Sequence, residues 1–300
     1  MNTTNKKTVL IAGASGVLGK ALINHFSDKG YTVYGLVRNA SSVPELTAMG
    51  VLLKEADMSQ PGSLTGVCEG IDVVIPAVHA MLGKGRNVPE NVDWQGHAEL
   101  IKQAADSGVK HFIYPSVYNA SAEHPLDFFR IKYRVEQQLK SSSIPYTIFR
   151  LPAFMEWHAW RLIGKDIKEK GKASIFGSGN NPINFISAQD IAKAIDQVVL
   201  NPSWYGSTLQ LSGPDNMCRN EIAELYAKRF SKSIKITRLP VGVLKIMAPV
   251  IKIFHPGIAR IMRFAMHTEN TDETRPASES ISQFGLQPTR LKDFVMQYAD

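Results

Sequence analysis

A glycine-rich turn near the start of the sequence is the first candidate for chemistry. Gly13, Gly16 and Gly19 follow an apolar run over 9–12 and precede an apolar-periodic segment over 17–26. Gly13 permits a tight turn, Gly16 lets the backbone approach a pyrophosphate, and Gly19 lets the following helix pack on the preceding strand. The helix N-terminus adds N–H groups and a positive dipole end, so the pattern predicts a dinucleotide site.

The type of dinucleotide follows from the end of the next strand, predicted over 31–37. An acidic residue there accepts a hydrogen bond from the ribose of NAD, but this chain carries Arg38. A guanidinium suits a 2′-phosphate through charge-assisted hydrogen bonds, and the Ser15 hydroxyl can join it. We therefore expect NADP(H) rather than NAD(H). The contacts predicted at the turn are those of Gly13, Ser15, Gly16, Val17, Leu18 and Gly19.

A parallel sheet is needed to position these residues, and the N-terminal half has the pattern of one. Strands that alternate with helical segments are expected over 8–13, 31–37, 51–54, 71–77, 111–115 and 144–151. This alternation indicates the α/β class, with a doubly wound parallel sheet of Rossmann type covered on both faces. Ligands bind such sheets at the carboxyl ends of the strands, where the strand order reverses.

The end of the fourth strand and the residues after it lie at this edge. The segment 71–77 is almost wholly apolar, as a central parallel strand should be. We expect Ala77, Val78 and His79 to contact the cofactor, at the start of a loop that carries glycines and basic residues. For His79, a loop position held by its backbone fits better than a catalytic role.

The pattern divides the chain into two parts. Residues 1–153, completed by 184–203, are expected to form the dinucleotide domain, and 154–183 with 204–300 a smaller C-terminal substrate or lid lobe. The apolar stretch over 241–267 fits a packed lobe best, and a substrate lid, a dimer face and a membrane-surface helix are its alternatives. We expect a monomer or a homodimer.

Composition is that of an ordinary globular protein. The chain is 44% apolar and 20% charged with a net charge of +7, and no run approaches the ~20 apolar residues of a membrane span. Cys68 and Cys218 form no metal-binding spacing, so free thiols in a cytoplasmic protein are expected, without a metal. The segment 219–263 holds ten basic and two acidic residues but no nucleic-acid motif, so no nucleic acid is expected as a partner.

The glycine spacing resembles that of the short-chain dehydrogenase/reductase superfamily. Ordinary members carry Tyr-x-x-x-Lys on the helix after the fifth strand, where the Tyr transfers a proton and the Lys holds the nicotinamide ribose. On the helix predicted over 127–140, Lys132 matches that Lys, but Phe128 stands in place of the Tyr. Since phenylalanine cannot transfer a proton, the ordinary carbonyl-reduction machinery is absent from its usual place.

Further segments sharpen this resemblance over nearly the whole chain. They are GASGVLG at 13–19, NVDWQG at 91–96, KHFIYPSV at 110–117, IKYRVEQQLKSSSIPYTIFRLPAFM at 131–155, FISAQDIA at 185–192 and LSGPDNMCRNEIA at 211–223. They resemble the atypical branch of NmrA-like proteins, isoflavone-reductase-like enzymes and photosystem assembly factors.

The resemblance implies roles for residues around the fifth strand. Lys132 is implied to act as a general base or as a ribose anchor, and both readings stay open. Ser116 corresponds to a serine that the superfamily keeps near the substrate oxygen. Tyr118 and His124 are candidates to replace the missing phenol, although each also fits a structural role. Lys132, Ser116 and Tyr118 are therefore the predicted catalytic residues.

Two acidic residues have structural alternatives. By the resemblance, Asp57 faces the adenine with the Met58 N–H beside it, but a helix cap also explains Asp57. Asp190 follows Ser187 by three residues ahead of an apolar-periodic run, which is the pattern of a capped helix. We therefore expect Asp190 to be structural.

An aromatic segment after the sixth strand is expected to contribute a substrate pocket. The predicted substrate contacts are Tyr118, His124, Phe154, Met155 and Trp157, and Trp160 adds to the same apolar wall. Such a wall favours a flat, apolar substrate. The sequence thus predicts an NADPH-dependent reductase of a small apolar molecule, such as an aromatic, enone or quinone-like compound. The alternative is a redox-silent NADP(H)-binding sensor or assembly protein of the NmrA-like type.

Overall fold

The computed structural model describes residues 7–298, which fold as two compact units. The first unit contains the chain up to Arg150 and Ile191–Gln210, and the second contains Leu151–Asp190 and the chain from Leu211 onward. The segment that returns to the first unit therefore lies later than the expected 184–203. The reason is that residues 183–186 pair with strands of the second unit, whereas 207–210 completes the large sheet.

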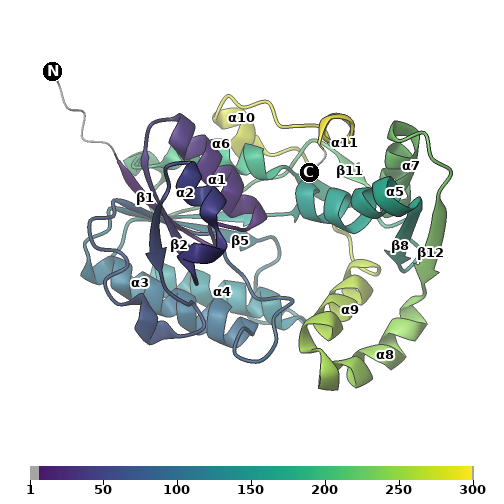
Figure 1. Ribbon diagram of the computed structural model, residues 1–300, viewed down its shortest axis with the longest axis horizontal. Helices are drawn as coiled ribbons and strands as arrows, with labels where there is room; N and C mark the ends of the chain where they lie inside the picture. The colour runs from purple at the N-terminus through teal and green to yellow at the C-terminus, as the bar shows by residue number, and fades with distance from the viewer. Residues whose placement is uncertain (1–6, 299–300) are drawn as a thin grey trace. The chain divides into compact units, whose positions relative to one another are not determined.

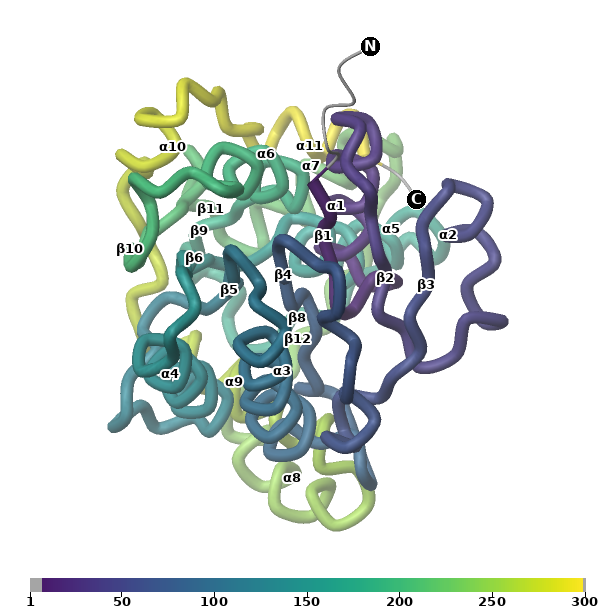
Figure 2. Tube along the Cα trace, turned by 90° about the vertical axis from the view of Figure 1, so that its left-hand side faces the viewer, coloured from purple at the N-terminus to yellow at the C-terminus, as the bar shows by residue number. Residues whose placement is uncertain are grey.

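The first unit is built on a seven-stranded parallel sheet. Its strands are β1 (Thr8–Ala12), β2 (Thr32–Val37), β3 (Leu52–Glu55), β4 (Val73–Pro76), β5 (His111–Val117), β6 (Tyr146–Leu151) and β10 (Ser207–Gln210). Figure 2 shows them side by side in the order β10-β6-β5-β4-β1-β2-β3. The order reverses at β1, which pairs in parallel with both β2 and β4. The predicted doubly wound α/β sheet is confirmed.

Helices cover both faces of this sheet (Figure 1). On one face lie α1 (Val17–Asp28) and α6 (Ala188–Val198), joined by a hydrogen bond of 3.0 Å between His25 and Asp196. On the other lie the π-helix η3 (Glu90–Gly96), α3 (His97–Asp106) and α4 (Asp127–Lys140). The short α2 (Pro44–Ala48) lies between β2 and β3 in the chain. Burial on two sides explains why β1 and β4 are nearly all apolar.

The second unit has smaller sheets and its own core. Its strands are β7 (Ala153–Phe154), β9 (Ile183–Ile186) and β11 (Asn216–Met217) in one sheet, and β8 (Lys172–Phe176) and β12 (Lys235–Leu239) in another. Its helices are the π-helix η4 (Met155–Gly164), α5 (Lys165–Lys170), α7 (Arg219–Arg229), α8 (Val241–Phe254), α9 (Pro256–Thr268), α10 (Glu279–Gln283) and α11 (Leu291–Gln297). One apolar cluster joins η4, α7 and α11.

Between β3 and β4 the chain forms the 3₁₀ turn η2 (Pro61–Leu64). One segment differs from the sequence prediction. The apolar stretch over 241–267 is two helices, α8 and α9, and only Leu244 and Ala248 of α8 are buried. A fully packed lobe is therefore wrong for α8. No helix within residues 7–298 combines the length and apolarity needed to cross a bilayer.

Two smaller predictions are confirmed. The Asp190 N–H donates to the Ser187 hydroxyl over 3.0 Å, and the Asp190 carboxylate accepts from the Thr289 N–H over 2.7 Å, so Asp190 is structural. Cys68 and Cys218 are both free and buried.

Candidate functional site

The glycine turn between β1 and α1 has the geometry that its spacing predicts. Gly13 adopts a φ of +81°, and a Cβ there would lie 2.8 Å from the Ala77 carbonyl oxygen at the end of β4. A Cβ on Gly19 would collide with the Gly13 carbonyl oxygen. The Gly16 N–H closes the turn by donating to Gly13 over 2.9 Å. The tight turn at Gly13 and the close helix–strand contact at Gly19 are thus confirmed.

The N-terminus of α1 offers a site for an anion. Its cap residue is Gly16, no side chain caps it, and no acidic residue lies in its first turn. Ser15, Gly16 and Val17 are exposed, whereas the Leu18 side chain is buried, so only the backbone of Leu18 is suited to a ligand. Uncapped N–H groups at a helix dipole end are suited to phosphate oxygens.

Arg38 and Asp57 lie beyond the ends of the neighbouring strands β2 and β3. Arg38 is exposed. The Asp57 carboxylate accepts from the Ser59 N–H over 2.8 Å and from the Gln60 side chain over 3.2 Å. Partial burial opposes ionisation of Asp57, but these hydrogen bonds and the Arg38 charge hold the pKa of Asp57 below its usual range. Asp57 thus shapes the turn before η2, and its contact with adenine remains a prediction.

Met58 and the residues after β4 lie, like Arg38 and Asp57, at the carboxyl ends of the strands. Met58 is buried, and its backbone lies so close to Gly96 of η3 that no Cβ fits between them. Ala77 and Val78 are half-buried and His79 is exposed. The loop is anchored where the Ala80 N–H donates to the fully buried Asp93 over 2.8 Å.

Lys132 lies inside the first unit, on the face of α4 toward the end of β5. It is only 5% exposed, and its Nζ donates to the Pro115 carbonyl over 3.1 Å. The Nζ lies 4.9 Å from the Tyr114 ring centroid and 5.8 Å from that of Phe128. Burial lowers the pKa of Lys132, although the charges of Asp93 and Glu136 oppose this effect. Phe128, at the position of the missing Tyr, also meets the His79 ring edge-on at 6.1 Å.

A buried hydrogen-bond network lies beside Lys132. The Ser116 hydroxyl donates to Glu136 over 2.5 Å, and Arg150 donates to both oxygens of that carboxylate, over 3.1 and 2.7 Å. Glu136 has no exposed surface. The sequence analysis missed both Glu136 and Arg150. The available signals were the i, i+4 spacing of Lys132 and Glu136, and an arginine within an apolar strand.

Tyr118 and His124 follow β5 in the first unit. Tyr118 is half-buried. His124 is buried, stacks on the Phe129 ring with centroids 3.9 Å apart, and accepts from the Leu126 N–H over 3.1 Å. These contacts give His124 a structural role at the start of α4, and a part for either residue in catalysis stays a prediction.

The residues of the predicted aromatic wall belong to the second unit, and two of them lie in its core. Met155 has no exposed surface and Trp160 is 2% exposed, and both fill the core cluster of this unit. They therefore pack against protein instead of walling a pocket. Phe154 and Trp157 are half-buried, and their contact with a substrate stays a prediction.

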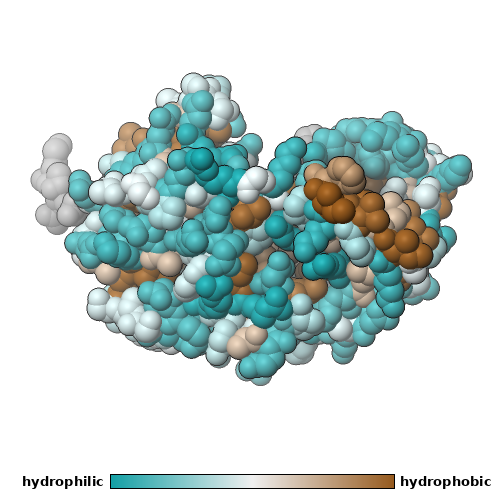
Figure 3. All heavy atoms as spheres, turned by 90° about the horizontal axis from the view of Figure 1, so that it is seen from below, coloured by the Kyte–Doolittle hydropathy of each residue, from teal (hydrophilic) through white to brown (hydrophobic). Residues whose placement is uncertain are grey.

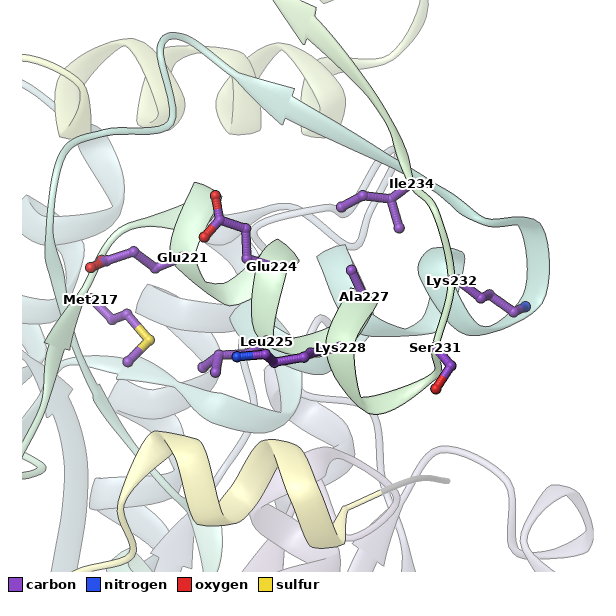
Figure 4. A pocket seen from close by; sticks show the side chains of 9 residues that line it. All are labelled: Met217, Glu221, Glu224, Leu225, Ala227, Lys228, Ser231, Lys232 and Ile234. Atoms are coloured by element: carbon purple, nitrogen blue, oxygen red, sulfur yellow. The ribbon is translucent and has the colours of Figure 1, made fainter.

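A surface hollow in the second unit is separate from the predicted site residues. Figure 4 shows it along α7. Its volume is about 660 Å³. It is lined by Met217, Glu221, Glu224, Leu225, Ala227, Lys228, Ser231, Lys232 and Ile234. No residue predicted to bind cofactor or substrate lines it.

The parallel sheet, its switch point beside β1 and the uncapped helix behind a glycine turn define the Rossmann class of nucleotide-binding α/β proteins. The chain belongs to the NmrA-like family, whose model matches residues 5–292. The family resemblance inferred from the sequence is thereby confirmed.

Relatives of this chain include proteins of different function. The photosystem II assembly factor Ycf39 of Guillardia theta is 30% identical over 301 residues, which cover 97% of this chain and 94% of that protein. The probable pinoresinol-lariciresinol reductase 3 of Arabidopsis thaliana is 29% identical over 244 residues, 77% of this chain and 76% of that protein. Among solved structures, the NADPH-dependent quinone oxidoreductase QOR2 of Escherichia coli, complexed with NADPH, has a TM-score of 0.75 at 21% identity, covering 96% and 98% of the two chains.

Proposed function

We propose that this chain binds NADP(H) at the carboxyl ends of the sheet in the first unit and reduces a small apolar acceptor. The cofactor fits the residues present. A pyrophosphate would rest on the uncapped N-terminus of α1, where the space beside Gly13 leaves no room for a Cβ. Arg38, exposed beyond β2, would hold the 2′-phosphate. QOR2, a reductase of similar fold, is complexed with NADPH.

The buried position of Lys132 is the observation that carries the reductase proposal. An ammonium group has three donors, and within residues 7–298 the Pro115 carbonyl is its one hydrogen-bond acceptor. The remaining donors are available for ribose hydroxyls, so Lys132 would orient the nicotinamide end of the cofactor. When bound, NADPH supplies the hydride; the chain supplies position and a dry environment.

Phe128 restricts which compounds can accept the hydride, because it cannot donate a proton to them. Hydride transfer to a simple ketone without a proton donor leaves an alkoxide, which is about as basic as hydroxide. Transfer to a quinone leaves a phenolate, whose conjugate acid has a pKa of about 10, as in tyrosine. The phenolate is therefore by far the weaker base and the more stable product. A site in which Phe128 replaces the phenol therefore favours quinones and related conjugated acceptors, whose products take their proton from solvent.

The experiment is NADPH oxidation by the purified chain against matched acceptors. We expect turnover with quinones and none with saturated ketones of similar size. Lys132→Met should remove the quinone activity, whereas Lys140→Met at the exposed end of α4 should keep it. Equal activity of Lys132→Met and the wild type would refute the role of Lys132.

A redox-silent binding function is the second candidate, and a specific contact favours it. The Ser116 hydroxyl donates its hydrogen bond to the buried Glu136 carboxylate, so neither Ser116 nor Phe128 offers a donor to a substrate. A relative of the chain, Ycf39, is an assembly factor. Tight NADPH binding with no oxidation by any acceptor of the panel would favour this function over the reductase.

A further inference from the structure

The outer face of α8 is a continuous apolar surface. Exposed apolar side chains recur three, four and seven residues apart, which places them on one side of a helix. This outer stripe consists of Val243, Ile246, Met247, Val250, Ile253 and Phe254. Ile246, Ile253 and Phe254 are 76%, 78% and 79% exposed, values that are unusual for such side chains. Figure 3 views the molecule from the side on which α8 lies in Figure 1 and shows apolar surface there in brown.

The inner face of α8 already has its partners. Leu244 and Ala248 are buried and form a small cluster with Met262 and Ala265 of α9. The outer stripe is therefore additional to the surface that holds α8 in the second unit. A helix that is apolar on both sides is ordinarily covered on both sides.

The charged residues in the segment that carries the outer stripe have one sign. Lys245 and Lys252 are exposed and seven residues apart, so they lie on one side of α8, outside the stripe. Arg260 and Arg263 follow on α9, and the sequence has no Asp or Glu from 225 to 268. An apolar face on a segment whose only charges are cations complements a surface that is apolar inside and anionic at its edge.

We propose that α8 lies in the interface of an anionic lipid bilayer, with its outer stripe among the acyl chains and Lys245 and Lys252 on the headgroup phosphates. The helix has 14 residues, about two thirds of the length needed to cross a bilayer, so it rests along the surface. A second copy of the chain fits less well, because it brings the same cations and no acidic residue from this segment. This surface is independent of the proposed reductase function.

Vesicle flotation with the full chain tests the proposal. The wild type should float with vesicles of phosphatidylcholine and phosphatidylglycerol in equal parts, and at least about tenfold less with phosphatidylcholine alone. The double variant Ile253→Ser/Phe254→Ser and the double variant Lys245→Glu/Lys252→Glu should each lose at least about tenfold in binding. Met296→Ser, which removes an exposed apolar side chain from α11, should float like the wild type.

Several outcomes would overturn the proposal. They are a wild type that stays unbound, equal flotation with neutral vesicles, and unchanged flotation of Ile253→Ser/Phe254→Ser. Sedimentation velocity without lipid tests the other occupant, a second copy of the chain. A wild type that does not bind vesicles and is a dimer, together with a monomeric Ile253→Ser/Phe254→Ser, would show that the outer stripe is a self-association face. Should a variant fail to fold, the lipid dependence of the wild type decides alone.

Discussion

Helices α4 and α8 have the same length, 14 residues, but α4 buries charged side chains and α8 exposes apolar ones. The polar helix α4 buries a lysine and a glutamate, Lys132 and Glu136, beside its apolar residues. The apolar helix α8 buries only Leu244 and Ala248 and exposes Ile246, Ile253 and Phe254. Each departs from the ordinary rule that charge lies outside and apolar surface inside.

The two departures have different physical explanations. In α4 the buried carboxylate is matched by Arg150 and Ser116, and the buried ammonium faces a carbonyl and two aromatic rings. The chain itself therefore supplies partners for both buried groups. In α8 nothing in the second unit covers the outer stripe within the described residues, and the compensation has to come from outside. Under the two proposals, the buried charge of α4 serves a ligand site and the exposed apolar surface of α8 serves a partner.

Replacing the buried cation of α4 should have the largest effect. Lys132→Met keeps the volume and the burial but removes the donors for ribose hydroxyls. We expect quinone reduction to fall by about 10²–10⁴-fold, the usual range for an essential proton-handling or positioning group. Initial rates at saturating NADPH measure this effect. A fall of less than about threefold would contradict the proposed role of Lys132.

The two faces of α8 should differ in their contribution to stability. Leu244→Ala removes a buried side chain from the small cluster with α9 and should cost about 2–4 kcal/mol in the free energy of unfolding. Ile253→Ala on the outer stripe should change it by less than about 0.5 kcal/mol. Urea unfolding measures both. Equal losses would mean that the outer stripe packs against the chain in solution.

The second unit also contains a buried charge, and it should give a pH-dependent stability. Both Glu156 oxygens accept from the Ala188 N–H, over 2.9 and 3.1 Å. Burial raises the pKa of Glu156 from 4.5 to about 7, against the opposing hydrogen bonds. The folded state then binds this proton more tightly, so its contribution is complete below pH 4.5 and declines as the pH rises through 7. The loss is about 3 kcal/mol.

Glu156→Gln provides the matched control for this titration. The amide oxygen can still accept from Ala188 but does not ionise. Unfolding free energies measured from pH 4.5 to 7.5 should therefore decline less for Glu156→Gln than for the wild type. Parallel pH profiles would show that Glu156 ionises normally in the folded chain.

Arg38 should have the smallest effect, on selectivity rather than on activity. Arg38→Gln removes the charge proposed for the 2′-phosphate and should reduce the preference for NADPH over NADH by about 10–100-fold, as expected for a charged hydrogen bond. Lys29→Gln, an exposed cation just beyond the C-terminus of α1, is the control. An unchanged ratio of the two affinities would place the phosphate elsewhere.

The sequence was informative where a local steric demand decides the structure. Gly13 and Gly19 predict their turn because a side chain at either position would meet backbone atoms only a few residues away or on the neighbouring strand. The alternating apolar runs predicted the sheet, since buried parallel strands leave little freedom in residue type. The π-helix η3, which directly precedes α3, was not predicted as a π-helix. The reason is that its apolar spacing is close to that of an α-helix.

The rest depends on contacts between distant residues. Glu136, Ser116 and Arg150 come from three elements, and the sequence signals for Glu136 and Arg150 do not show that these residues meet. Met155 and Trp160 fill a core, although an aromatic run has the same pattern in a core as in a pocket. The same ambiguity made α8 look like part of a packed lobe. Apolar periodicity indicates that one face of a helix is covered, but it does not show what covers it.

The central claim is that the uncapped turn before α1 and the guanidinium of Arg38 bind a phosphorylated nicotinamide dinucleotide. Isothermal titration of the purified wild-type chain with NADPH and with NADH tests it most directly. We expect one NADPH per chain, bound at least about tenfold more tightly than NADH. Absence of binding to either dinucleotide would contradict the account.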